Sequence, residues 1–173
     1  VAARINRANA LLRAGREDAA ATEYEGLLSD YPDRLRVAYN LAAIRIRQDR
    51  CDDALPLLGR FVTSRPDHAT ALYFKGDCEV RMGLGDDARA TMARVVELTP
   101  SNPWAHHALA RLDFAGGDLD SALTHSRRAA EVSPDEWEIA SALGTLLRRS
   151  GEAEEALGWH ERAAGSSAAR SGP

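Results

Sequence analysis

The chain has 173 residues, of which 28% are charged and 6% aromatic. By length this is enough for one domain, and the composition argues against disorder. No apolar run reaches the roughly 18 residues of a membrane-spanning helix, and the formal net charge of −4 gives no global preference for nucleic acid. We therefore expect a folded protein with neither a nucleic-acid nor a membrane partner.

The N-terminal stretch VAARINRANA lacks the continuous apolar core of a signal peptide and does not begin with methionine. We expect a cytoplasmic location and a sequence that can be a piece of a longer chain. The two cysteines, Cys51 and Cys78, form neither a disulfide framework nor a metal site. We expect them to behave as small buried apolar residues or as surface thiols.

An internal repeat organises the chain. The stretch GLGDDARATMARVVELTP, residues 83–100, has matching stretches at every step of 34 residues. Such a period indicates a repeat architecture. We divide the chain into five repeats and a small polar tail, residues 165–173, which we expect to be disordered. The repeats are 1–34, 35–68, 69–102, 103–136 and 137–164.

The same spacing of small and helix-breaking residues recurs in each repeat of the chain. We call a residue's place within its repeat its repeat position. Alanine or glycine occupies positions 8 and 20 of all five repeats, which predicts two closely packed helices. Glycine at position 15, replaced by Asp49 in repeat 2, predicts a left-handed turn that strains the aspartate. Proline at position 32 of repeats 1–4 ends the second helix.

These signals predict helix A over repeat positions 2–14 and helix B over positions 17–30. Pro103 is placed where the first turn of a helix tolerates proline. The residues that follow the position-32 prolines can cap the next helix A; they are Asp33, Asp67, Ser101 and Asp135. One hairpin cannot bury its apolar face, whereas stacked hairpins can, so we expect an all-α superhelical solenoid.

This pattern resembles the tetratricopeptide repeat over essentially the whole chain. The resemblance implies an all-α, right-handed superhelical solenoid of antiparallel helix pairs. The chain departs from the family pattern at position 4, which lacks the aromatic residue, and at position 11, which is Arg45, Glu79 and Asp113 in the central repeats. The apolar residue moves to position 12, which predicts either an altered helix rotation or a more apolar groove.

In the tetratricopeptide family, helix A lines a concave groove, and the resemblance implies that this groove binds a peptide. The matching positions give candidate peptide-binding residues in four repeats. They are Asn6, Asn9, Arg13, Arg36, Tyr39, Asn40, Arg47, Tyr73, Phe74, Asp77, Arg81, Trp104, His107 and Arg111. Repeat 5 adds Glu138, Ser141, Thr145, Arg148 and Arg149 to the same face.

Arginine dominates the charge of this predicted groove, with seven arginines against Asp77 and Glu138. A concave basic surface attracts acidic ligands, and guanidinium groups bind carboxylates through two parallel hydrogen bonds. The sequence therefore predicts an acidic, extended or helical peptide ligand. The alternative is that the position-13 arginines, Arg13, Arg47 and Arg81, only complement the C-terminal end of helix A.

The asparagines suggest a way to hold a peptide backbone, because side-chain amides both donate and accept hydrogen bonds. Asn9 and Asn40 match two places of the family's carboxylate clamp, whereas the basic places of that clamp are Ile5, Thr70 and Phe74 here. A backbone-binding asparagine pair is the interpretation we favour over a clamp for chaperone C-termini, and solvated asparagines are the alternative.

We find no sequence support for catalysis, a cofactor or a metal. The adjacent His106 and His107 point about 100° apart on a helix and make a poor chelate. Gly83 and Gly85 belong to the turn between helices, and no strand precedes them as a phosphate loop requires.

The leading hypothesis is a non-enzymatic scaffold that binds a segment of another protein. The alternatives are the recognition arm of a larger transferase- or hydroxylase-type enzyme, and a self-assembling adaptor that docks through its uncapped last helix B, with Leu157 and Trp159. The enzyme-arm hypothesis rests on fold-level analogy alone.

Overall fold

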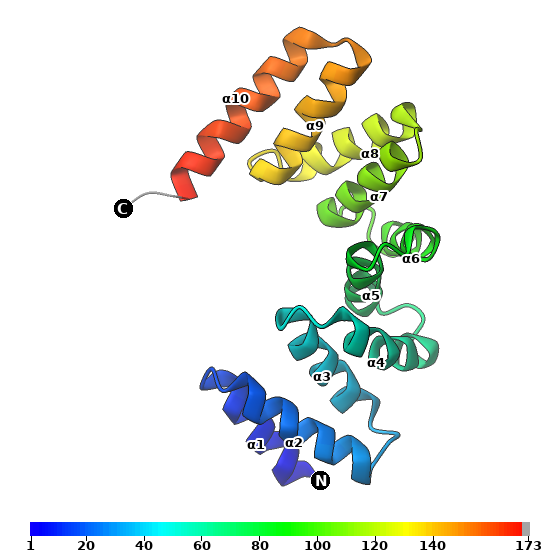
Figure 1. The fold of residues 1–173 in the computed structure, drawn as a ribbon, viewed down its shortest axis with the longest axis vertical. Coiled ribbons are helices and arrows are strands. Elements are labelled where there is room, and N and C mark those ends of the chain that lie inside the picture. Colours follow the sequence, from blue (N-terminus) through cyan, green and yellow to red (C-terminus); the bar gives the residue numbers. More distant parts are fainter. Residues whose placement is uncertain (171–173) are drawn as a thin grey trace. The chain divides into compact units, whose positions relative to one another are not determined.

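The computed structural model describes residues 1–170 and confirms the all-α fold class. Within them ten helices follow one another, paired as hairpins (Figure 1). Their bounds are α1 (Ala2–Arg13), α2 (Glu17–Asp30), α3 (Leu35–Arg47), α4 (Cys51–Ser64), α5 (Ala69–Arg81), α6 (Gly85–Leu98), α7 (Pro103–Ala115), α8 (Leu119–Val132), α9 (Trp137–Ser150) and α10 (Ala153–Arg170).

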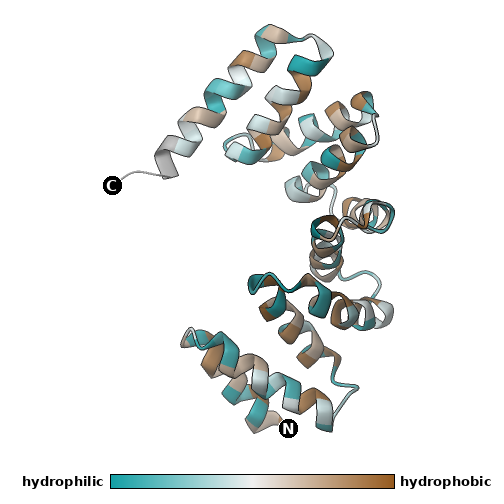
Figure 2. Ribbon diagram, in the orientation of Figure 1, coloured by the Kyte–Doolittle hydropathy of each residue, from teal (hydrophilic) through white to brown (hydrophobic). Residues whose placement is uncertain are grey.

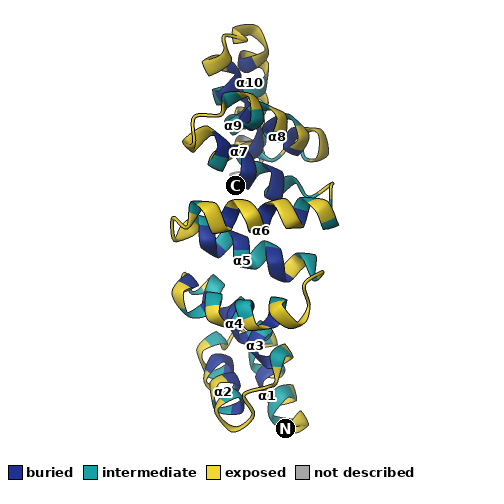
Figure 3. Cartoon of the chain, turned by 90° about the vertical axis from the view of Figure 1, so that its right-hand side faces the viewer, coloured by how far each residue is buried: buried dark blue, intermediate teal, exposed yellow. Residues whose placement is uncertain are grey.

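The chain forms two compact units, Val1–Thr91 and Met92–Pro173, which we call the N-terminal unit and the C-terminal unit. The division falls inside α6. Apolar and polar residues alternate along the helices of both units (Figure 2), and buried and exposed residues alternate in the same way (Figure 3). Each unit thus builds its core from one face of several amphipathic helices.

The repeat period predicts the helix bounds closely. Helices α2, α4, α6 and α8 all run from repeat position 17 to position 30, as expected for helix B. The preceding turns use glycine with a positive φ at position 15, and Asp49 takes that place with a φ of 60°. Asp49 is the single non-glycine residue with a positive φ among residues 1–170. The predicted backbone strain at Asp49 is confirmed, because the left-handed region is costly for residues with a Cβ atom.

The small residues at positions 8 and 20 lie in the core, as the spacing predicts. In repeats 1 and 2 they are completely buried: Ala8, Ala20, Ala42 and Ala54. Ala110 and Ala122 occupy the same places in α7 and α8 and are 1% and 0% exposed. Because the two helices of a hairpin meet at these alanines, their axes can approach closely.

The predicted helix caps are wrong by one residue. Pro32 and Asp33 form a turn in which the Arg34 N–H donates to the Tyr31 carbonyl at 3.2 Å. The same bond recurs after each position-32 proline, at 3.2 Å for His68, 3.0 Å for Asn102 and 3.4 Å for Glu136. Asp33, Asp67, Ser101 and Asp135 therefore lie in the middle of a proline turn, one residue too early to cap.

The N-cap residues are instead those at position 34. His68 accepts from the Ala71 N–H at 3.1 Å, and Asn102 accepts from the Ala105 N–H at 3.0 Å. Arg34 and Glu136 stand at the same place and make no side-chain cap. Pro103 begins α7, in the first helical turn, as expected.

The last helix is longer than expected. Helix α10 continues to Arg170, so the prediction of a disordered tail is wrong for residues 165–170. Position 32 of repeat 5 is alanine rather than proline, so every backbone amide needed to continue the helix is present. Residues 171–173, the rest of the predicted tail, lie outside the described residues.

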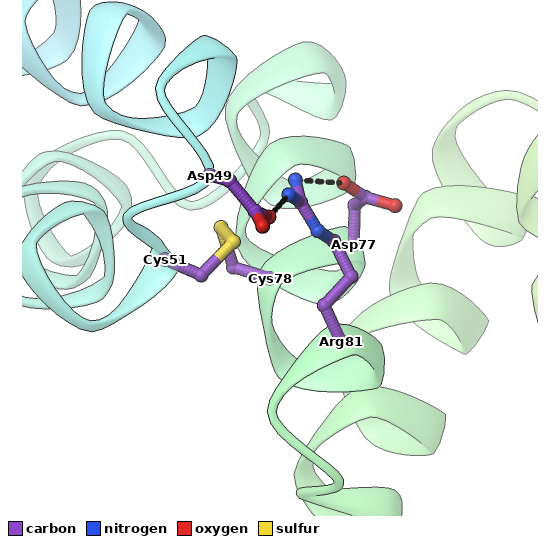
Figure 4. Close-up of a disulfide and its surroundings, with 5 residues drawn as sticks. All are labelled: Asp49, Cys51, Asp77, Cys78 and Arg81. Carbon is purple, nitrogen blue, oxygen red and sulfur yellow. Dashed lines mark hydrogen bonds and ion pairs between the residues drawn. A yellow bond between two sulfur atoms is a disulfide. The ribbon is translucent and has the colours of Figure 1, made fainter.

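The expectation of two unpaired cysteines is also wrong. Cys51 at the start of α4 and Cys78 in α5 form a disulfide, with their Cα atoms 5.1 Å apart (Figure 4). Both residues are buried, at 6% and 0% exposure, as expected of cysteine. The bond joins helix B of repeat 2 to helix A of repeat 3. Its physical basis is the stacking of these two helices, which a spacing of 27 residues does not reveal.

The polar residues at position 11 are buried, and each has a polar partner. Arg45 is 7% exposed, bonds Gln48 at 2.6 Å and pairs with Glu25. Glu79 is 4% exposed and pairs with Lys75. Asp113, 5% exposed, lies 3.9 Å from His125. Position 11 thus faces the interior in repeats 2 to 4, so altered helix rotation does not account for the apolar residue at position 12.

Candidate functional site

In the N-terminal unit, two of the three asparagine candidates, Asn9 and Asn40, contact a buried tyrosine. Tyr24 of α2 is completely buried, and its hydroxyl donates to Asn9 Oδ1 at 2.6 Å. The Asn40 amide donates to the same hydroxyl oxygen at 3.3 Å. Burial raises the pKa of Tyr24, and the Asn40 hydrogen bond opposes this shift. The tyrosine therefore fixes both amides and leaves the Asn9 NH₂ and the Asn40 carbonyl oxygen for other partners.

The aromatic candidates of α3 and α5 belong to one cluster. The Tyr39 ring lies 4.8 Å from Phe61, 5.5 Å from His68 and 6.2 Å from Phe74, between centroids. Tyr39 and Phe74 also pack on the core that contains the disulfide. They are half-buried, so part of each ring supports the core and part remains accessible.

Tyr73 is the most strongly perturbed of these side chains. Its centroid lies 6.1 Å from that of Phe74. Burial, with a smaller contribution from the neighbouring Asp77 carboxylate, raises the pKa of Tyr73 to about 12. The hydroxyl is therefore neutral at physiological pH and available as a hydrogen-bond donor.

The arginine candidates of the N-terminal unit divide into two groups. Arg47 bonds Glu17 at 2.7 Å, and Arg81 pairs with Asp49 and approaches Asp77 at 3.6 Å (Figure 4). Arg13 and Arg36 are exposed. Neither forms an ion pair within residues 1–170, and the exposed Asn6 likewise has no side-chain hydrogen bond there.

In the C-terminal unit, α7 and α9 enclose a pocket of about 370 Å³. Its lining includes His107, Arg111 and Phe114 of α7 and Trp137, Glu138 and Leu146 of α9. Three residues that the sequence assigned to repeat 5, Glu138, Ser141 and Thr145, line the same pocket. The predicted residue Trp104 lies beside it, with its ring 6.0 Å from His107 and edge-on to it.

Sequence reasoning missed Trp137. It occupies repeat position 1, which is not among the groove positions of the family pattern. Trp137 and Phe114 are each 41% exposed, although aromatic rings of this size are usually covered. Helix A of repeat 5 begins at Trp137, one position before the start expected from the sequence, so this residue belongs to the helix that lines the pocket.

Two histidines of α7 have pKa values below the ordinary range. Burial lowers the pKa of His107, and the Arg111 charge lowers it further against the opposing effect of Glu138. Burial is also the main cause of the lowered pKa of His106. The His106 Nε2–H donates to the Pro100 carbonyl at 3.1 Å, so its neutral Nδ1 accepts from His125 Nδ1 at 3.0 Å.

These histidines predict that the C-terminal unit loses stability as the pH falls. A histidine with a lowered folded-state pKa binds its proton more readily when unfolded, below about pH 6.5. Stability should therefore decrease from about pH 7 toward pH 5, by about 1.4 kcal/mol for each unit of lowering. Urea unfolding followed by tryptophan fluorescence measures this, because all three tryptophans lie in the C-terminal unit.

The matched variant is His106→Gln combined with His107→Gln, which should flatten the pH dependence over that range. An unchanged slope in the double variant would contradict the assignment. The other groups whose charges act on His106 are His125 and Arg128, which lower its pKa, and Glu131, which raises it; all three are kept in the double variant.

Within residues 1–170 no helix has the length and apolar character that crossing a bilayer requires. The same residues contain no group of three or more histidine, cysteine, aspartate or glutamate side chains placed to hold a metal ion.

Family models described as tetratricopeptide repeat match residues 1–25, 39–103 and 107–172. The chain belongs to the tetratricopeptide repeat family. No match to a curated protein sequence reaches significance.

Several solved structures share the fold. MamA from Desulfovibrio magneticus RS-1 is 16% identical, with a TM-score of 0.85, over 98% of this chain and 96% of that one. A second MamA structure is 18% identical, with a TM-score of 0.83, over 94% and 95% of the two chains. YrrB, described as a TPR protein with an unusual peptide-binding site, is 19% identical, with a TM-score of 0.78, over 94% and 84%. At these identities the likeness concerns the fold alone.

Proposed function

We propose that this tetratricopeptide repeat protein is a scaffold that binds an extended, acidic segment of another protein along the A helices of its N-terminal unit. Membership of a family of protein-interaction repeats supports the general role. The peptide-binding site attributed to YrrB supports a peptide as the ligand.

One observation carries the proposal: the Tyr24 hydroxyl holds two asparagine amides in fixed orientations on neighbouring A helices. The Asn9 NH₂ remains a donor and the Asn40 carbonyl oxygen remains an acceptor. An extended peptide offers one N–H and one C=O per residue, so the pair is complementary to a backbone of any sequence. Orienting the amides before binding reduces the entropy lost when the peptide docks.

The charge preference follows from Arg13 and Arg36, which belong to the same two helices, α1 and α3. Both are exposed and form no ion pair within the described residues. Arg47 and Arg81 are already neutralised by Glu17, Asp49 and Asp77. We therefore assign carboxylate binding to Arg13 and Arg36 rather than to every arginine of the predicted groove.

The test is a binding titration with fluorescein-labelled peptides that carry aspartate at alternate positions, compared with the same peptides carrying asparagine. Fluorescence anisotropy should show tighter binding of the aspartate peptides, with a preference that weakens as salt is added. Arg36→Glu should weaken binding of the aspartate peptides by about tenfold or more, because it places a like charge beside the ligand.

Arg50→Glu is the matched control. It makes the same charge change in the N-terminal unit, but Arg50 is the N-cap residue of helix α4, outside α1 and α3, and its side chain already pairs with Asp53. The control should change affinity by less than about twofold. Equal effects of the two variants, or no preference for aspartate, would refute the proposal.

A further inference from the structure

The pocket between α7 and α9 contains two opposite charges that do not meet. Arg111 and Glu138 both line it. Among the described residues they form no ion pair with each other, and neither forms one with a third residue. Glu138 Oε2 is buried without a hydrogen-bond partner. A buried carboxylate oxygen with no partner is uncommon in folded proteins, because it costs free energy. A ligand that supplies a hydrogen-bond donor would remove that cost.

The rest of the pocket favours a flat apolar group. Phe114 and Trp137 are on opposite helices, each 41% exposed, and no ring contact joins them. His107 is neutral at physiological pH because its pKa is lowered by burial. The volume of about 370 Å³ falls in the range of small-ligand pockets, roughly 300–1,000 Å³.

We propose that this pocket is an anchor site for a tryptophan side chain of a partner protein, followed or preceded directly by an acidic residue. The indole ring lies between Phe114 and Trp137, its N–H donates to the Glu138 carboxylate, and the acidic residue pairs with Arg111. The occupant is taken to be a protein segment, so the inference rests on the proposed function, but it concerns a different unit of the chain.

Each group of the proposed ligand is complementary to one feature of the pocket. Aromatic rings gain from edge or offset contact with other rings beyond the area they bury. Indole adds a donor and no acceptor, which suits a carboxylate. Rotation about the terminal torsion of glutamate is soft, so the side chain can present either oxygen to the ring. An adjacent carboxylate completes the charge balance, because Arg111 is exposed and unpaired.

The probe is the peptide acetyl-Gly-Asp-Trp-Gly-amide, titrated into the ¹⁵N-labelled chain and followed by amide shifts in NMR spectra. The expected result is a set of shifts confined to α7 and α9. Replacing Trp by Ala should abolish saturable binding. Replacing it by 1-methyltryptophan, or Asp by Asn, should each weaken binding by about tenfold.

Two substitutions identify the groups responsible. In Glu138→Gln the peptides with tryptophan and 1-methyltryptophan should bind more nearly alike, and in Arg111→Gln the Asp and Asn peptides should bind alike. The comparison is made only in a variant that still binds at least one peptide of the pair, because an unfolded variant would bind neither and would also show no discrimination. If either variant fails to fold, the peptide series on the unchanged chain still decides the outcome.

Shifts confined to the N-terminal unit, or no difference between tryptophan and alanine peptides, would overturn the anchor site. Those results would leave the acidic-segment proposal standing, since that proposal depends on Arg36 and the aspartate peptides. Conversely, tryptophan-dependent shifts in α7 and α9 with no effect of Arg36→Glu would support the anchor site alone.

Discussion

Replacing both Cys51 and Cys78 by alanine is expected to lower the free energy of unfolding of the N-terminal unit by about 3 to 4 kcal/mol. The disulfide closes a loop with a sequence separation of 27, and removing the link gives the unfolded chain the conformational freedom that the link denies it. The effect should be confined largely to one unit, because both cysteines belong to helices α4 and α5.

The chain's own chromophores separate the two units in this experiment. All four tyrosines belong to the N-terminal unit, and all three tryptophans to the C-terminal unit. Urea unfolding followed by circular dichroism should show the loss, while the tryptophan-detected transition stays close to that of the parent chain. Dithiothreitol should reproduce the effect in the parent and have none in the variant. Coincident curves for the parent and the variant would show that the link contributes little.

Replacing Lys75 by methionine is expected to destabilise the N-terminal unit by about 3 kcal/mol or more. Lys75 pairs with Glu79 and donates to Thr91 Oγ1 at 3.1 Å. The Glu79 side chain is only 5% exposed, and its Oε2 already lacks a partner. Without Lys75 the carboxylate is buried with no neighbouring positive charge, which costs more than the pair itself contributes.

The control is the double variant Lys75→Met with Glu79→Leu, which removes both charges and fills similar space. Its stability should return close to that of the parent chain, since buried pairs can be replaced by apolar residues at little cost. Denaturant midpoints of the two variants give the comparison. The explanation is wrong if the double variant is as unstable as the single one.

The fold could be predicted because its determinants are local and repeat. Position-15 turns and position-32 prolines limit helix B from within the same repeat, and the small residues at positions 8 and 20 report the hairpin contact directly. The cap at position 34 could not be found in this way. It depends on how the proline turn closes, which places His68 and Asn102, rather than Asp67 and Ser101, before the first helical turn.

The candidate site was predictable to a lesser degree, because its character depends on neighbouring repeats. Arg47 is neutralised by Glu17, 30 residues earlier, and Arg81 by Asp49, 32 residues earlier. Counting the charged residues of the A helices from the sequence gives Arg47 and Arg81 the same weight as Arg36, which forms no ion pair among the described residues. The disulfide was missed for the same reason, since its two halves are brought together only by the stacking of repeat 2 on repeat 3.

Lys75 is the one lysine of the chain, beside 21 arginines. An amine-acylating reagent therefore has a single side-chain target. The Lys75 side chain is only 25% exposed and its amine is held by Glu79, so acylation requires the pair to separate. The acylated nitrogen no longer carries the charge that holds Glu79, so the pair does not form again. Each acylated molecule therefore records that its Lys75–Glu79 pair had separated. The labelling rate of Lys75 would thus time the local opening of α5 without any engineered probe.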